Sequence, residues 1–233
     1  MRAVLLAGGK GTRLFPYTAV FPKPLVPLGE KPILEILLRR LRKHGFKKVT
    51  LCVGHMSYLI QTFFKDGQWL DMEIDYSLED KPLGTVGPLA LIEDLPDLFL
   101  VANGDLLTDA NFKKMVADHK QKKALLTIGV YNRAEKMELG VLEVKNKRVV
   151  NYLEKPTKNY LISAGVYIFD KKVLKYVEAG KHMDFPKLVN LLLKKKVKIN
   201  YFLIKGFWLD IGRPDDYQKA VEMFTADSKR FVE

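Results

Sequence analysis

The residues best suited to chemistry lie near the start of the chain, where residues 6–14 read Leu-Ala-Gly-Gly-Lys-Gly-Thr-Arg-Leu. Glycines that directly follow a short apolar run let the backbone approach a ligand, and successive amide hydrogens can cradle phosphate oxygens. Arg13 adds a planar guanidinium group that suits a phosphate. The segment has neither the spacing of a Walker loop nor that of the Gly-x-Gly-x-x-Gly dinucleotide fingerprint. Alone, it fits either a phosphate-binding loop or a glycine turn with an exposed arginine.

A lysine between two prolines is the second candidate. In Pro22-Lys23-Pro24 the prolines restrict the backbone on both sides of the lysine. A lysine held rigidly in a loop offers a point charge to a triphosphate. The tripeptide also occurs in ordinary loops, so it supports a polyanion site only in combination with the glycine-rich segment.

Alternating strands and helices are expected to position these residues. Apolar runs predict strands and helical spacing of apolar residues predicts the helices between them. The expected strands are residues 2–6, 49–53, 73–76, 98–102 and 125–131. The expected helices are one that Pro32 opens and Gly45 stops, then residues 58–64, 86–92 and 111–120. This alternation is typical of βαβ units and a mostly parallel sheet.

After about residue 135 the pattern becomes richer in strands. Residues 140–144 and 149–153 alternate like the strands of a hairpin with its turn at 145–147, and 162–169 and 199–204 are further strands. Helices are expected near residues 172–176 and 185–194, with a closing helix from Pro214. No linker and no internal repeat is evident. The prediction is one compact α/β domain, with a Rossmann-like, mostly parallel mixed sheet flanked by helices and an added β-rich half.

Composition narrows the class of protein. The 233 residues include 39 Lys and Arg against 27 Asp and Glu, a net charge of +12, but the basic residues are scattered and form no nucleic-acid-binding pattern. We therefore predict no nucleic-acid partner. The single cysteine, Cys52, excludes a disulfide-stapled scaffold, and no apolar run approaches the roughly 20 residues of a membrane span. Without signal-peptide features either, the expected location is the cytoplasm. The four histidines lack metal-ligand spacing and are interpreted as structural.

Taken together, the motifs resemble those of the sugar-1-phosphate nucleotidylyltransferases over nearly the whole chain. Residues 6–14 and 21–27 are similar to that family's nucleotide-binding loop and its lysine, and residues 82–89 are similar to its base-recognition stretch. The resemblance implies a nucleotide-binding half at about residues 1–135 of a single catalytic domain, residues 1–233. The implied nucleotide-binding residues are Leu6, Ala7, Gly8, Gly9, Gly11, Thr12, Arg13, Lys23, Glu79, Gly84, Thr85 and Asn103.

The same resemblance implies a sugar-phosphate-binding half at about residues 136–225. Its residues would be Gly140, Glu154, Lys155 and Ser163, the last of which stands where many members have Asn. Asp105 and Asp210 match the family's two Mg²⁺-binding aspartates. In isolation, Asp105 also fits a turn residue or a helix cap, Asp210 also fits a turn, and Glu154-Lys155-Pro156 fits a plain surface turn better. Their joint occurrence in the family's order favours the functional interpretation. The chain contains no hexapeptide repeat of the left-handed β-helix that several members carry.

The implied reaction transfers a nucleoside monophosphate from a nucleoside triphosphate to a sugar 1-phosphate. Arg13, Lys23 and Asp105 would be its catalytic residues, and Mg²⁺ its cofactor. Residues 82–89 and 206–212 look most like those of guanylyltransferases acting on mannose or manno-heptose 1-phosphate. The alternatives are a dTTP, UTP or CTP enzyme acting on glucose or N-acetylmuramate 1-phosphate, and a non-catalytic nucleotide-sugar sensor. The oligomeric state stays open, a homo-oligomer included.

Overall fold

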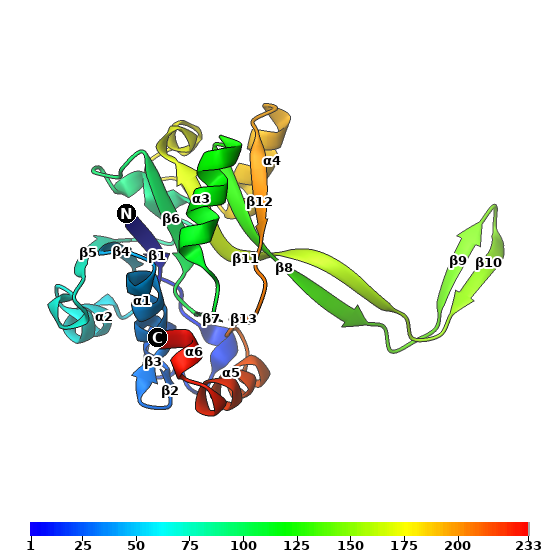
Figure 1. Cartoon of the computed structure of the whole chain (residues 1–233), viewed down its shortest axis with the longest axis horizontal. Helices are drawn as coiled ribbons and strands as arrows, with labels where there is room; N and C mark the ends of the chain where they lie inside the picture. Colours follow the sequence, from blue (N-terminus) through cyan, green and yellow to red (C-terminus); the bar gives the residue numbers. More distant parts are fainter. Residues whose placement is uncertain (233) are drawn as a thin grey trace.

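A seven-stranded sheet with the order β12-β8-β11-β6-β1-β4-β5 forms the centre of the computed structural model, which describes residues 1–232 (Figure 1). In chain order its strands are β1 (Arg2–Leu6), β4 (Lys48–Val53), β5 (Glu73–Leu78), β6 (Leu98–Asn103), β8 (Leu126–Lys136), β11 (Thr157–Asp170) and β12 (Ile199–Leu203). β1 runs parallel to β4 and β6, β4 to β5, and β12 to β8. Only β11 is antiparallel to its neighbours, so the predicted mostly parallel mixed sheet is confirmed.

Both faces of the sheet are covered, which explains why its central strands are apolar without alternation. Ala3 and Leu5 of β1 belong to one buried cluster and Val4 to another on the opposite face. The first cluster includes residues of α1 (Ile33–Lys43), α2 (Ser57–Phe64) and α3 (Phe112–Lys122). The second includes residues of α4 (Phe185–Lys194) and of two short 3₁₀ helices, Gly87–Leu91 and Lys171–Tyr176. The two 3₁₀ helices stand where the sequence predicted helices at 86–92 and 172–176.

The ends of the main helices follow the signals in the sequence. α1 begins after Pro32 and ends before Gly45, whose φ of 84° is a left-handed conformation that glycine adopts without strain. Asn111 caps α3 by accepting a hydrogen bond of 2.8 Å from the backbone N–H of Lys114. Both helices were predicted from the sequence within about two residues.

A third buried cluster lies beside the main sheet and was not predicted. It joins the two-stranded sheet of β7 (Leu106–Thr108) and β13 (Trp208–Asp210) to α5 (Pro214–Ala226) and α6 (Lys229–Val232). β2 (Pro27–Leu28) and β3 (Lys31–Pro32) pair antiparallel next to it, and two 3₁₀ helices, Thr12–Leu14 and Lys23–Leu25, precede them. A further 3₁₀ helix covers Gln68–Leu70. The unpredicted strands have only two or three residues, too few to show a hydrophobic period.

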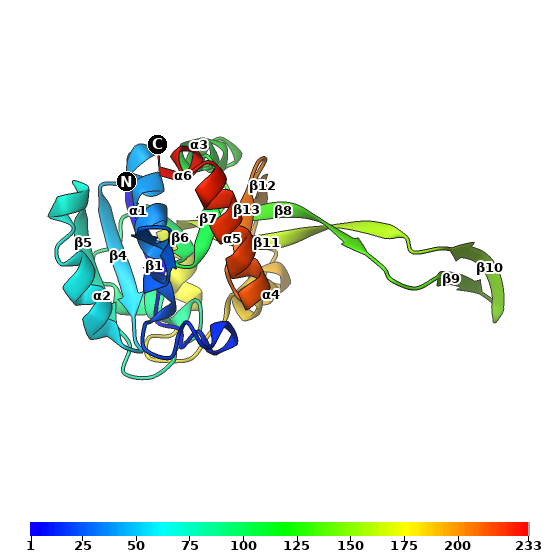
Figure 2. The same cartoon turned by 90° about the horizontal axis from the view of Figure 1, so that it is seen from below.

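A long two-stranded ribbon projects from this body (Figures 1 and 2). The outer parts of β8 and β11 continue into the hairpin of β9 (Val141–Lys145) and β10 (Arg148–Leu153). We call residues 132–162 the arm. Asn146 and Lys147 both have positive φ, as in a two-residue type I′ turn, so the predicted hairpin is confirmed. No residue from 131 to 163 is buried. The prediction of a compact domain is therefore wrong here, because a ribbon of two strands has no second layer to cover its side chains.

The two halves that the sequence suggested are not separate in the sheet. β11 and β12 come from the second half, and β11 pairs directly with β6 of the first. Among residues 1–232, no helix is both long and apolar enough to cross a bilayer.

Candidate active site

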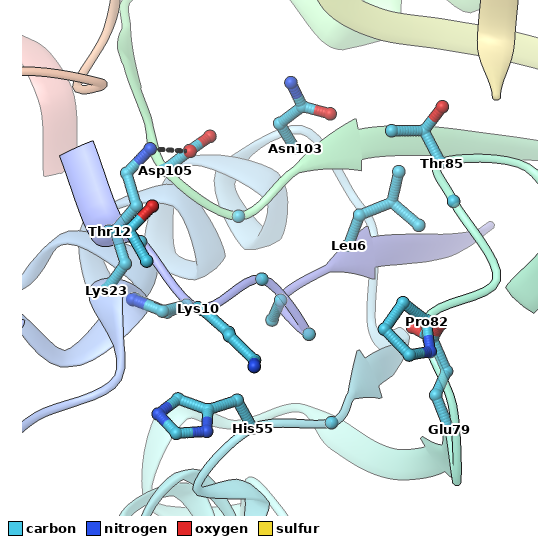
Figure 3. Close-up of a pocket in the computed structure, with 18 of the residues that line it drawn as sticks. Leu6, Lys10, Thr12, Lys23, His55, Glu79, Pro82, Thr85, Asn103 and Asp105 are labelled. Carbon is cyan, nitrogen blue, oxygen red and sulfur yellow. Dashed lines mark hydrogen bonds and ion pairs between the residues drawn. The ribbon is translucent and has the colours of Figure 1, made fainter.

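A pocket of about 790 Å³ opens at the carboxyl ends of β1, β4, β5 and β6 (Figure 3). Ligands of open α/β sheets bind at this edge because the loops that leave the parallel strands converge there. Every residue that the resemblance assigned to the nucleotide lines this pocket, and so does Asp105: Leu6, Ala7, Gly8, Gly9, Gly11, Thr12, Arg13, Lys23, Glu79, Gly84, Thr85, Asn103 and Asp105. In Figure 3, Lys23 and Asp105 lie at one end of the pocket and Glu79, Pro82 and Thr85 at the other.

The glycines after β1 allow contacts that a larger residue would block. A Cβ atom on Gly8 would lie 2.9 Å from Oε1 of Glu79 and 3.3 Å from the backbone nitrogen of Gly54. Gly11 has a φ of 64°, and a Cβ atom there would lie 2.9 Å from Cβ of Lys23. The loop is thus packed against the lysine, and glycine at these positions leaves the loop backbone free to approach a ligand.

Lys23 is a buried cation held between two carboxylates. Its side chain is 11% exposed, its ammonium group forms an ion pair with Oδ2 of Asp105, and Nζ lies 3.9 Å from Oδ1 of Asp210. Such burial of a lysine is rare unless the charge is paired. Burial, and next the charge of Asp105, raise the pKa of the Asp210 carboxyl group, whereas Lys23 and Arg13 lower it.

The two aspartates meet because β7 and β13 pair, although they are far apart in sequence. In this antiparallel pair Asp210 lies opposite Leu106, directly after Asp105. The backbone N–H of Ile211 donates to the backbone carbonyl of Asp105 at 3.1 Å, which fixes the two segments together. The structure therefore brings Asp105 and Asp210 together as the resemblance implied.

At the opposite end of the pocket, residues 79–85 contact one another and the segment that leads into α4. Glu79 accepts a hydrogen bond of 3.0 Å from the backbone N–H of Leu83, while burial raises the pKa of its carboxyl group. Thr85 Oγ1 accepts a bond of 2.7 Å from the backbone N–H of Phe185. Gly84 has a φ of 79°, and a Cβ atom there would lie 2.6 Å from Oδ1 of Asp184. These contacts fix the backbone that a nucleobase would meet.

Several residues of the pocket were missed in the sequence. They are Gly54, His55, Asp80 and Lys81, whereas Lys10, Pro24, Pro82, Gly104 and Gly212, which also line the pocket, lie within the segments that the resemblance already indicated. His55, one of the four histidines interpreted as structural, lines the pocket and donates its backbone N–H to the carbonyl of Gly8 at 3.4 Å. Their position in the chain could have indicated them: Gly54 and His55 directly follow β4, which runs parallel to β1 beside it in the sheet.

Three of the four residues assigned to the sugar phosphate lie on the arm, apart from this pocket. Gly140 sits beneath Tyr152, whose hydroxyl would be 2.1 Å from a Cβ atom on Gly140. The same hydroxyl donates to Glu154 at 2.8 Å, and Lys155 follows with a φ of 44°. A non-glycine residue held at positive φ is uncommon and strained. Gly140, Glu154 and Lys155 thus form a cluster of their own, and none of them lines the pocket.

Ser163, the fourth residue, lies at the root of the arm and does not line the pocket. Its hydroxyl lies 3.1 Å from that of Tyr167, and the register of β11 against β8 shifts between these two residues. Within this irregularity Gly165 has a φ of 66°, and a Cβ atom there would lie 2.6 Å from Nδ2 of Asn103. The indole N–H of Trp208 donates to the Ala164 carbonyl at 2.8 Å. The root is thus tied both to Asn103 of the pocket and to β13.

The two aspartates fit a divalent cation. One oxygen of each, Oδ1, is buried and accepts no hydrogen bond from the described part of the protein. Mg²⁺ is commonly held by one or two carboxylates together with substrate phosphates and water. Among residues 1–232 no third Asp, Glu, His or Cys joins them to make a protein-only metal site. A cation here would therefore take its remaining ligands from a bound phosphate and from water.

The fold and this pocket define an α/β protein with a glycine-rich pocket that basic side chains line at the carboxyl edge of its sheet. The chain belongs to the nucleotidyl transferase family, whose pattern matches residues 2–227. It is 36% identical to the mannose-1-phosphate guanylyltransferase catalytic subunit beta of Drosophila pseudoobscura pseudoobscura, over 98% of this chain and 64% of the relative. It is 34% identical to the UTP–glucose-1-phosphate uridylyltransferase of Synechocystis, over 95% of this chain and 62% of the relative. The chain thus spans less than two thirds of the length of these relatives.

Among solved structures, HddC from Yersinia pseudotuberculosis, complexed with GMP-PN, has a TM-score of 0.74 and 30% sequence identity. The match covers 96% of this chain and 99% of that one. The predicted family and its α/β fold are therefore confirmed.

Proposed function

We propose that this protein transfers a nucleoside monophosphate from a nucleoside triphosphate to a sugar 1-phosphate, with Mg²⁺ as cofactor. The observation that carries the proposal is the group of Lys23, Asp105 and Asp210 at the end of the glycine-rich loop. A phosphate-binding loop alone would fit many nucleotide-binding proteins. A buried lysine between two carboxylates with unpaired oxygens adds the charges that a triphosphate and a divalent cation require.

In the proposed reaction the phosphate oxygen of the sugar 1-phosphate attacks the α-phosphorus of the triphosphate. The new phosphorus–oxygen bond forms as the bond to the oxygen bridging the α- and β-phosphorus atoms breaks, and the electron pair leaves with pyrophosphate. No general base is needed because a sugar phosphate is already an anion at neutral pH. Holding the reacting groups in line and neutralising their charge supplies most of the rate acceleration.

Each group of residues has a part in this arrangement. The backbone of residues 8–12 would cradle the phosphates, and Arg13 and Lys23 would balance the charge that builds on the leaving pyrophosphate. Asp105 and Asp210 would hold Mg²⁺, which neutralises phosphate charge when bound. Gly140, Glu154, Lys155 and Ser163 are proposed for the sugar phosphate.

GTP with a manno-configured sugar 1-phosphate is the substrate pair that we propose. The 36% identical guanylyltransferase and the GMP-PN complex of HddC support it. The 34% identical uridylyltransferase supports UTP with glucose 1-phosphate as the rival. We also propose a cytoplasmic location, since nucleoside triphosphates are made there.

The test is pyrophosphate release with Mg²⁺, with GTP, dTTP, UTP, CTP and ATP each offered mannose, glucose, manno-heptose and N-acetylmuramate 1-phosphates. We expect turnover with GTP and a manno-configured sugar. Asp105→Asn should lower turnover at least 100-fold, whereas Asp97→Asn, a change at an exposed aspartate outside the pocket, should not alter it. Nucleotide binding without turnover for any pair would overturn the proposal in favour of a sensor.

A further inference from the structure

The arm extends away from its own body, yet it carries the cluster that the proposed reaction needs near the nucleotide. Gly140, Glu154 and Lys155 lie at the base of the β9–β10 hairpin, and the pocket is lined without any residue of the arm. Both views show the hairpin well separated from the sheet edge where the pocket opens (Figures 1 and 2). In this arrangement the chain holds its two groups of candidate residues in different places.

The arm exposes apolar side chains along its length. Leu139 is 75% exposed, Val144 62% and Val149 60%. A two-stranded ribbon is marginally stable on its own in water, and exposed apolar surface of this extent marks an interaction site. The arm therefore requires a surface that covers it.

The contacts at the root of the arm fix the direction in which the arm projects from the sheet. Between Thr157 and Ser163, β11 pairs residue by residue with β8, over a length of roughly 20 Å at the usual rise per strand residue. At the inner end Ala164 is fully buried and accepts the hydrogen bond from Trp208, and Gly165 packs against Asn103. Folding the arm back onto its own pocket would break this ladder or its buried root. A surface on another molecule can cover the arm with the ribbon intact.

The covering molecule is best identified by what the arm brings with it. Glu154 and Lys155 are exposed, and Lys155 forms no ion pair with any other described residue. An exposed cation without a protein counter-charge suits an anionic ligand. The molecule that offers a matching phosphate site is a second copy of the same chain, whose pocket likewise lacks the arm residues. Exchange of an identical element between two copies is a low-cost route to a closed, two-fold dimer.

We infer that two copies of this chain exchange arms, so that the partner subunit's Lys155 and the partner subunit's Glu154 complete the sugar-phosphate side of each nucleotide pocket. The inference rests on the proposed function for the role of these residues. It adds that the acceptor side is shared between subunits, so a single copy would bind nucleotide without completing the transfer.

Complementation between two inactive variants tests the shared site. Lys155→Ala removes the arm's cation and Asp105→Asn damages the pocket, and each variant alone should be inactive. The two chains, carrying different affinity tags, are co-expressed and the mixed dimer is purified. With exchanged arms, one of its two sites receives an intact arm and an intact pocket, so we expect roughly half the wild-type turnover per dimer. If each arm serves its own pocket, both sites of the mixed dimer stay defective. A mixed dimer without turnover, measured beside an active wild type, therefore overturns the inference.

Sedimentation mass supplies a readout that does not depend on activity. Ala134 and Asn159 are paired across the ribbon, so a two-residue Asn-Gly turn can replace residues 135–158 between them. This shortened chain should be a monomer where the wild type is a dimer. Val144→Lys should weaken the dimer at least tenfold, whereas Tyr58→Lys, a change at a side chain of similar exposure on α2, should leave it unaltered. A monomeric wild type, or a dimer that survives loss of the arm, overturns arm exchange. A wild type that dimerises through its arm but turns over no substrate overturns the proposed function instead.

Discussion

Replacement of Lys23 by methionine would expose the balance of charge in the pocket. The substitution keeps the length of the side chain but leaves Asp105 and Asp210 facing each other without a counter-charge. Removing one partner of a fully buried ion pair costs about 3–5 kcal/mol. The side chains of Lys23 and Asp105 retain 11% and 20% exposure, so we expect a loss of about 2–3 kcal/mol in the free energy of unfolding.

The same variant should respond to Mg²⁺ more strongly than the wild type does. Lys23 competes with a cation for Asp105, and methionine does not. A ligand that binds only the folded state stabilises it by an amount that grows with the logarithm of its concentration relative to its dissociation constant, so Mg²⁺ held by the two carboxylates should restore part of the lost stability. Turnover should nevertheless fall at least 100-fold, since a charge facing the triphosphate is missing.

Urea unfolding followed by tryptophan fluorescence, with and without Mg²⁺, measures both effects. Lys23→Arg keeps the charge and should lose less stability, and Lys114→Met removes an exposed lysine on α3 and should match the wild type. A loss below about 0.5 kcal/mol for Lys23→Met, the range of ordinary surface substitutions, would refute the reasoning. An equal response of the variant and the wild type to Mg²⁺ would refute the competition between lysine and cation.

Three further changes test single contacts by urea unfolding. Gly165→Ala places a Cβ atom 2.6 Å from the Asn103 amide at a φ of 66°, and should cost about 1–3 kcal/mol; a neutral result would contradict the strain. Trp208→Phe removes the bond to the Ala164 carbonyl and should cost about 1–2 kcal/mol, and unchanged stability would mean that water replaces the indole. Burial, aided by nearby cations, lowers the pKa of His44 from 6.5 to about 4, so the unfolded chain binds the proton first as the pH falls. Wild-type stability should therefore drop by about 1–3 kcal/mol from pH 6.5 to 4 relative to His44→Gln, and parallel profiles would contradict this shift.

Much of the site could be predicted because its chemistry lies where strands end. The glycine-rich loop follows β1, Asn103 ends β6 and Asp105 follows it, so the rule for parallel sheets places them together. The same rule applied to β4 would have indicated His55, which was judged instead by metal-ligand spacing alone. A strand-end position is a signal that does not depend on residue type.

The rest of the site depends on long-range pairing that has no local signal. Asp210 reaches Asp105 only through the three-residue pairing of β7 with β13, and three residues are too few for a hydrophobic period. The hairpin of the arm was predicted from its alternating residues and its turn. Its projection from the body was not, because alternation indicates a covered face without indicating which molecule covers it.

The arm leaves the sheet on β8 and returns on β11, and these two strands are neighbours. Insertions, deletions and substitutions between them therefore leave the register of the central sheet unchanged. The glycine-rich loop and the paired aspartates belong to the rest of the fold, so such changes leave the pocket that they line unaltered. Under the proposed function, we expect descendants of this chain to acquire new acceptor sugars mainly through substitutions in the arm, while the nucleotide that they transfer stays the same.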